Sequence, residues 1–378
     1  MKTLAFASLA PLAFIFAAAC SSSSKPTVAA GDGGTSATCS APATLTSADF
    51  CSTCSFSGAA NPATCANNRP LNACCAWVQE PKQEAQRGTS LHYFGSPDGT
   101  TTPNLDCLTT PVALGTPKTV TLKGFVKLFS SGNDSAGVKI EIYKEGPNHD
   151  GALGDLVGTA FTTSSDDQLD APQMPLPTWS SKCPTDGCRL RSYTYQGVPT
   201  EPRLIVKTSD ATGTGNTWSE LYDYNIYIPN SAVDATNVAP YDPSAVASTD
   251  VNTVASAAGG FTVKPDKGVL AGEVHDCGDV RISGAMVDTD LPHEGEMFYF
   301  NDVESDPLPD KTRAPSGLGT SKLGLFGALN IQTGTPMKIS AVIKSGGKDV
   351  LLGTYTVQLF PGAITALSFR GRRPWQTK

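Results

Sequence analysis

The amino-acid sequence predicts a mainly β protein in which two β modules follow a small cysteine-rich module. Hydrophobic residues make up 39% of the chain and charged residues 17%, while 36 glycines and 28 prolines provide many turns. Val138, Ile140 and Ile142 alternate with more polar residues, as in a half-buried strand. Seven of the eleven cysteines lie between Cys39 and Cys107, a density typical of small exported domains that disulfides hold together.

The N-terminal segment, residues 1–19, has the pattern of a secretory signal peptide. Lys2 precedes an apolar run of about 16 residues, shorter than the ~20 that a membrane-spanning helix needs. Three alanines and then Cys20 close the run. These residues resemble the lipobox of bacterial lipoproteins, in which the cysteine is acylated and becomes the new N-terminus. The resemblance implies that Cys20 carries a lipid such as palmitate. The alternative is an ordinary signal peptide with a cysteine near its cleavage site.

The segment 20–38 is predicted to be a lipid anchor followed by a flexible tether. It is rich in serine, glycine, alanine and threonine, and it has too few large apolar residues to form a core. The expected location is the cell envelope, with the membrane contacted through the lipid. Ser21 stands where an Asp would resemble an inner-membrane retention signal, which indicates the outer membrane. Whether the protein faces the periplasm or the surface stays open.

The cysteine count predicts disulfides. Without Cys20, ten cysteines remain, an even number in a chain expected to be exported into an oxidising compartment. Cys183 and Cys188 most simply pair with each other across four turn-forming residues. Cys277 then pairs with one of the seven N-terminal cysteines, such as Cys107. The disulfide candidates are Cys39, Cys51, Cys54, Cys65, Cys74, Cys75, Cys107, Cys183, Cys188 and Cys277.

Two other interpretations of the N-terminal cysteines are weaker. Cys51 and Cys54, followed by Cys74 and Cys75, have the residue types of a zinc site, but their spacing is irregular. A redox-active pair at Cys51 and Cys54 is a further alternative. The expected compartment favours structural disulfides over both.

The rest of the chain divides by pattern. A helix is expected in the linker, where Asp242-Pro243 offers a start, Val251, Val254 and Ala258 recur at helical spacing, and Gly259-Gly260 ends the run. The predicted segments are a cysteine-rich module at 39–111, a first β module at 118–229, a linker with one helix at 230–267 and a second β module at 268–371.

The second β module carries a series of short motifs. They are Gly272-Glu-Val274, Gly284-Ala-Met-Val287, Thr320-x3-Gly324-Leu-Phe326 and Gly334 before Met337-Lys-Ile339. In series they resemble a carboxypeptidase regulatory-like domain, whose fold is a seven-stranded transthyretin-like β-sandwich. The resemblance implies that Val274, Val287 and Phe326 face the core, and that Gly284 and Gly324 form turns.

The first β module repeats this pattern more loosely, with Gly124-Phe-Val126 and Gly137-Val-Lys-Ile140 in the corresponding places. Two transthyretin-like sandwiches in tandem are therefore expected. A lipobox, a cysteine-rich head and tandem copies of this domain together resemble surface lipoproteins of Gram-negative bacteria such as myxobacteria.

The sequence indicates a non-catalytic protein. It contains no Gly-x-Ser-x-Gly, no His-Glu-x-x-His, no phosphate loop and no EF-hand loop. His275, Asp276 and Cys277 are adjacent, so on a strand they point to alternating faces and cannot converge as a triad. In the carboxypeptidases, the domain resembled here is the non-catalytic partner. The expected function is structural, or ligand binding through sandwich loops, with a glycan or an envelope protein as partner. The net charge of −7 is spread along the chain, so no nucleic-acid partner is expected.

Two functional alternatives remain. One is a divergent hydrolase hidden in the cysteine-rich module or between the two β modules. The other is a carbohydrate-binding accessory protein with an aromatic face, although the same aromatic residues are more simply core. These residues are Trp179, Trp218, Tyr222, Tyr224 and Tyr227.

An acidic segment between Asp288 and Asp310 carries eight carboxylates and no Lys or Arg. The favoured interpretation is a solvated loop, and recognition of a basic partner is another. A calcium site is the third, because this cation takes six to eight oxygen ligands; no other cofactor is expected. The candidate calcium ligands are Asp288, Asp290, Asn301, Asp302 and Glu304.

Overall fold

The computed structural model describes residues 44–45, 103–109, 113–129, 134–165, 167, 190–291, 293–303, 306–345, 348–370 and 373–374. The chain divides into two compact units, Met1–Ala37 and Thr38–Lys378, and the described residues all belong to the second. The signal peptide, the tether and most of the cysteine-rich module therefore lie outside the described residues. So do Cys20, Cys39, Cys51, Cys54, Cys65, Cys74, Cys75, Trp179, Cys183, Cys188 and Glu304. Among the described residues no helix is long and apolar enough to cross a membrane.

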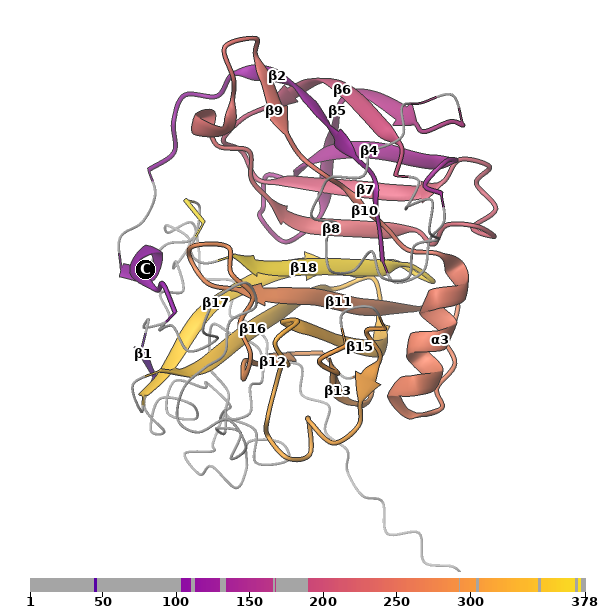
Figure 1. Cartoon of the computed structure of the whole chain (residues 1–378), viewed down its shortest axis with the longest axis vertical. Helices are drawn as coiled ribbons and strands as arrows, with labels where there is room; N and C mark the ends of the chain where they lie inside the picture. Colours follow the sequence, from indigo (N-terminus) through magenta and orange to yellow (C-terminus); the bar gives the residue numbers. More distant parts are fainter. Residues whose placement is uncertain are drawn as a thin grey trace, which may run out of the picture. The chain divides into compact units, whose positions relative to one another are not determined.

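The described part of the chain is mainly β, as the sequence predicts. Its largest sheet has nine strands in the order β14-β13-β15-β11-β18-β8-β7-β4-β5 (Figure 1). In chain order these strands are β4 (Val138–Glu145), β5 (Leu153–Thr162), β7 (Leu204–Asp210), β8 (Leu221–Ile226), β11 (Lys267–His275), β13 (Glu294–Phe300), β14 (Pro309–Asp310), β15 (Leu325–Gln332) and β18 (Ile364–Arg370).

Three smaller sheets accompany it within the described residues, in the orders β1-β17-β16-β12, β6-β2-β9 and β10-β3. Their strands are β1 (Thr44–Leu45), β2 (Thr119–Phe125), β3 (Lys127–Leu128), β6 (Ser192–Pro199), β9 (Val238–Pro240), β10 (Ser244–Ala245), β12 (Met286–Thr289), β16 (Pro336–Ser345) and β17 (Lys348–Gln358). Short helical segments are α2 (Asp106–Thr109) and η5 (Asn230–Ala232).

The nine-stranded sheet contains strands of both predicted β modules. β8 of the first module pairs in parallel with β18 of the second, from Leu221 opposite Ile364 to Tyr224 opposite Leu367. Figure 1 shows β7, β8, β18 and β11 in succession. The sequence pattern predicts separate modules at 118–229 and 268–371, whereas backbone hydrogen bonds join them in one sheet. Alternation of side chains identifies a strand but not its neighbours, so this pairing is not visible in the sequence.

The two faces of the nine-stranded sheet pack against different layers. In β7, Leu204 and Val206 belong to a core shared with β2 and β6, while Ile205 between them belongs to a core shared with β16 and β17. Successive side chains of a strand point to opposite faces. The β16–β17 sheet therefore covers one face, and the β2–β6 sheet covers the other.

Helix α3 (Ser248–Gly259) covers a further part of the second face. Its Val251, Val254 and Ala258 pack against a cluster that includes Leu221 and Ile364, so the predicted apolar stripe is confirmed. Its start differs from the expected Asp242-Pro243, because Ser244–Ala245 pair with β3 instead and the helix begins afterwards. Gly260 ends it in a left-handed conformation, with φ of 75°.

Several residues of the second module take the expected places. Val274, Val287 and Phe326 are buried in one core, and Gly284 and Gly324 have φ angles of 80° and 69°, which favour glycine. Gly272 has a different reason to be glycine. A Cβ atom there would lie 2.0 Å from the carbonyl oxygen of Leu367 on the adjacent β18.

Candidate functional site

A groove with a volume of roughly 810 Å³ crosses β8, β18 and β11 on the face that carries α3. The three strands are parallel neighbours in register, so their side chains on this face form rows. The row at one end of the groove is apolar and consists of Leu221, Ile364 and Val269. The next row holds Asp223, Ala366 and Ala271, and beyond it lie Ser368 beside Glu273 and then Arg370 beside His275.

The apolar half of the groove lies under helix α3. Val251 and Val254 of the helix and Phe298 and Phe300 of β13 line it. Phe129, which follows β3, packs edge-to-face on Phe300 with 6.2 Å between ring centroids. An aliphatic or aromatic group of a ligand would replace water here, which is favourable.

The charged half of the groove is organised by His275 at the end of β11. Its Nε2 lies 2.7 Å from Oε2 of Glu273, and its Nδ1 lies 3.0 Å from Oδ1 of Asp279. Burial lowers the pKa of His275, but the hydrogen bonds to Asp279 and Glu273 outweigh burial and the pKa is raised overall. Burial alone would raise the pKa of Glu273; the bond from His275 and the charge of Arg281 lower it to about 2.

The other cations of the groove also have carboxylate partners. Arg281 Nη2 lies 3.0 Å from Glu273 Oε1, and Arg370 donates to Asp279 Oδ1. Both ring nitrogens of His275 face carboxylate oxygens, and the raised pKa favours the imidazolium, in which both nitrogens donate. In that form His275 contributes a positive charge and has no lone pair with which to accept a proton.

Asp223 differs from these carboxylates. Burial raises its pKa to about 7, opposed by the charge of Arg370 and by the hydrogen bond from Tyr241. The Tyr241 hydroxyl donates to Asp223 Oδ2 at 3.3 Å. Within the described part of the chain, Asp223 forms no ion pair. Its carboxyl group therefore feels the charge of Arg370 without forming an ion pair with it among the described residues.

Asn225 lines the groove two residues farther along β8. The register between β7 and β8 shifts there, and Asn225 has a left-handed φ of 65°. Its Nδ2 donates to the Ser368 carbonyl at 2.9 Å, whereas its buried Oδ1 accepts no hydrogen bond from the described residues. Bulges of this kind often re-aim side chains near binding sites.

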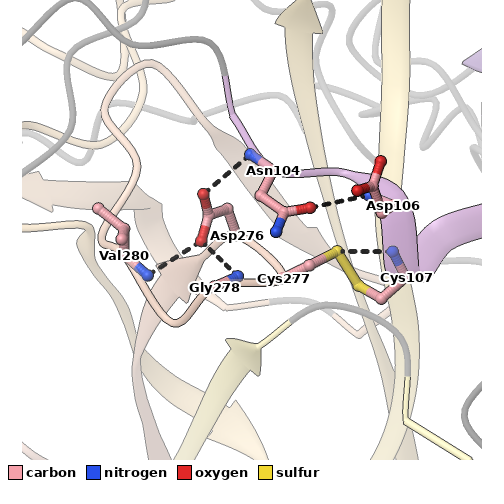
Figure 2. Close-up of a disulfide and its surroundings, with 7 residues drawn as sticks. All are labelled: Asn104, Asp106, Cys107, Asp276, Cys277, Gly278 and Val280. Atoms are coloured by element: carbon pink, nitrogen blue, oxygen red, sulfur yellow. Dashed lines mark hydrogen bonds between the residues drawn. A yellow bond between two sulfur atoms is a disulfide. The ribbon is translucent and has the colours of Figure 1, made fainter.

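The side chains of His275, Asp276 and Cys277 do not point to a common site, as the sequence predicts. His275 faces the groove, and Asp276 turns to the backbone. Figure 2 shows the Asp276 carboxylate accepting hydrogen bonds from the N–H groups of Asn104, Gly278 and Val280. These bonds shape the turn after β11 and attach it to Asn104.

Cys277 forms a disulfide with Cys107 (Figure 2). This is the pairing that the cysteine count suggested, and it joins residues 170 positions apart with 5.7 Å between their Cα atoms. The Cys277 N–H donates to the Asn104 carbonyl at 2.9 Å. The bond therefore attaches residues 103–109 to the end of β11, next to the groove.

The candidate calcium ligands bind the protein itself. Asp288 lies 3.5 Å from His293 Nε2, and Asp290 accepts a hydrogen bond from the Lys338 N–H. Asn301 accepts from the N–H of Val303 in its own turn, and Asp302 accepts from the N–H of Lys322, 20 residues farther along the chain. Among the described residues, no three or more His, Cys, Asp or Glu side chains are grouped so as to hold a metal ion.

Most of the described aromatic residues considered for a glycan-binding face are buried. Trp218, Tyr222 and Tyr224 are 5%, 4% and 0% exposed, so they belong to the cores. Tyr224 and Tyr227 both line the groove, and Arg373 lies 5.6 Å from the centroid of the Tyr227 ring. The interpretation of these residues as core is confirmed for three of them.

Most groove residues were not identified from the sequence. Asp223, Glu273 and Arg370 become neighbours only through the pairing of β8, β18 and β11, which the sequence does not reveal. A usable signal is present within single strands: Val269 and Ala271 are followed at alternate positions by Glu273 and His275. When the side chains on one face of a strand change from apolar to charged along its length, the strand is expected to run from the hydrophobic core into a polar groove.

Neither the protein-family models nor the curated proteins provide a match to this chain.

Proposed function

We propose that this chain is a lipid-anchored, non-catalytic binding protein of the bacterial cell envelope, held at the outer membrane through Cys20. The groove across β8, β18 and β11 would be its binding site. The observation that carries the proposal is the ionic state of the groove: His275, Glu273, Asp279, Arg281 and Arg370 hold one another as fixed charges. Such an arrangement orients a ligand but offers no free base among these residues.

We further propose that the two β modules are divergent transthyretin-like domains of the carboxypeptidase regulatory-like type, as in surface lipoproteins of Gram-negative bacteria. The support comes from the second module, where the motif residues Val274, Val287 and Phe326 share one core. Gly284 and Gly324 take the left-handed conformations that their places in the motif require. The first module would then supply β8 to the common sheet.

The lipid anchor leads to a direct prediction. Cells expressing the full chain and fed labelled palmitate are expected to incorporate the label, and the Cys20→Ala variant is expected to lose it. The label should appear in the outer-membrane fraction after separation on a density gradient. Equal labelling of the variant would contradict lipidation at Cys20, and a label confined to the inner membrane would contradict the proposed location.

Binding in the groove leads to a second prediction. Ala366 lies in its floor, so Ala366→Phe should fill the space between Asp223 and Ala271. In a thermal-shift screen of amines, carboxylic acids, alcohols and sugars, at least one class is expected to stabilise the parent protein but not this variant. Ala211→Phe, on an exposed turn, is the matched control and should respond like the parent. If the groove-filled variant responds to every stabilising compound, the groove is not the binding site.

A further inference from the structure

Most cations of the groove are engaged by carboxylates, and Arg373 lies over the ring of Tyr227. Arg281, Arg370 and His275 are engaged by Glu273 and Asp279. Lys127, at the rim, lies 3.3 Å from Asp242. An incoming anion would have to displace one of these carboxylates from its cation. A donor group would displace nothing.

Two side chains of β8 supply acceptors to the groove. Asp223 receives one hydrogen bond from the described residues, that of Tyr241, and Oδ1 of Asn225 receives none from them. Both residues line the groove. A buried acceptor that meets no donor has lost its hydration without replacement, which is unfavourable. A ligand carrying N–H groups would correct this.

The position of Asp223 defines the rest of such a ligand. In the strand register it stands beside Ala366 and Ala271, one row from the apolar set Leu221, Ile364 and Val269. The two alanines leave space over the sheet between these rows. A ligand with its polar group at Asp223 would therefore place its other end in the apolar half under α3.

We propose that the groove binds an amphipathic organic cation, with its ammonium group at Asp223 and its apolar body against Leu221, Ile364 and helix α3. The proposal rests on the binding function argued above and specifies the ligand class. The ammonium group donates to the Asp223 carboxylate, with Asn225 Oδ1 as a second acceptor within the same wall. The raised pKa of Asp223 agrees with this arrangement, because desolvation outweighs the charge of Arg370 and a bound ammonium would supply a further opposite charge.

The experiment compares three probes with the same tail and different head groups: n-octylamine, n-octanoate and n-octanol. Binding to the full chain is measured by calorimetry at about pH 8, where an Asp223 carboxyl with a pKa near 7 is mostly ionised. Octylamine is expected to bind best. Asp223→Asn should weaken octylamine by about tenfold or more, the usual loss for a charged hydrogen bond, and leave octanol unchanged.

Two control variants make the result specific. Asp266→Asn removes an exposed carboxylate that lies outside the groove lining and is paired with Lys267, and it should leave octylamine binding nearly unchanged. Ala366→Phe should abolish binding of every probe that enters the groove.

The remaining outcomes overturn the proposal in distinguishable ways. If octanoate binds best and is lost in Ala366→Phe, the groove binds ligands but its ligand is an anion. If octylamine and octanol bind equally well and Asp223→Asn changes the affinity of neither, the groove recognises only the alkyl tail. If no probe responds to Ala366→Phe, this ligand class is wrong, and the broader thermal-shift screen then decides whether the groove binds anything.

Discussion

Removal of the disulfide between Cys107 and Cys277 is expected to lower the free energy of unfolding by about 4 kcal/mol. The bond closes a segment of 170 residues. In the chain-entropy description, a loop of that length destabilises the unfolded chain by about 5 kcal/mol, and the stabilisation that disulfides provide is often smaller than this value. The variant to test is Cys107→Ser with Cys277→Ser, so that no single thiol remains to exchange with other cysteines. Urea unfolding of parent and variant measures the difference.

Local hydrogen bonds make this variant a clean comparison. The carboxylate of Asp276 still holds the N–H groups of Asn104, Gly278 and Val280 when the sulfur bond is gone. The folded state should therefore keep its geometry near the groove, and the loss should come from the unfolded chain. Superimposable circular-dichroism spectra would verify the fold. An unchanged urea midpoint would show that the bond does not stabilise the protein.

Asp223→Asn is expected to stabilise the protein at about pH 8 by on the order of 2 kcal/mol and to have little effect near pH 4. The pKa of Asp223 is raised from 3.8 in the unfolded chain to about 7 in the fold. Between these values the folded protein binds more protons, so the stability contributed by this group falls as the pH rises. Asparagine cannot ionise, and the variant avoids that loss.

The groups that face Asp223 support the sign of this effect. Arg370 on β18 lowers the pKa of Asp223 and Glu273 on β11 raises it, while Tyr241 donates a hydrogen bond that lowers it. The pKa of Glu273 is lowered from 4.5 to about 2, so its contribution to stability is lost as the pH falls between these values, in parent and variant alike. Guanidinium unfolding of both proteins at about pH 4 and about pH 8 gives the comparison. A stability difference that is the same at both pH values would refute the assigned ionisation.

Local features were predictable from the sequence because they depend on nearby residues. The alternation of Val138, Ile140 and Ile142 gave β4, and the spacing of Val251, Val254 and Ala258 gave the buried stripe of α3. Counting cysteines predicted a bond from Cys277 to one of the seven N-terminal cysteines, and the structure has it with Cys107, which was named as an example. The periodicity of a strand or helix is set by residues within a short segment, and the cysteine count depends only on how many cysteines the chain contains.

The common sheet and the groove were not predictable in this way. β8 is placed beside β18 by hydrogen bonds between backbone groups, which every residue type except proline can make. The residues Asp223 and Glu273 are far apart in sequence and meet only because β18 lies between their strands. The opposite case is also present: Asp290 and Asp302, two of the calcium candidates, are near in sequence but accept hydrogen bonds from different backbone segments, and the calcium site stays a hypothesis.

The position of β18 also imposes an order on folding. β18 follows every other described strand along the chain, yet in the sheet it lies between β11 and β8. Until it arrives, each of those two strands has an unpaired edge that can pair with another chain. Its contacts with β8 close a long loop, and such non-local pairing is slow to form. A chain made from its N-terminus therefore holds a divided sheet for most of its synthesis, and the interval before β18 joins is the period in which it is most prone to aggregate.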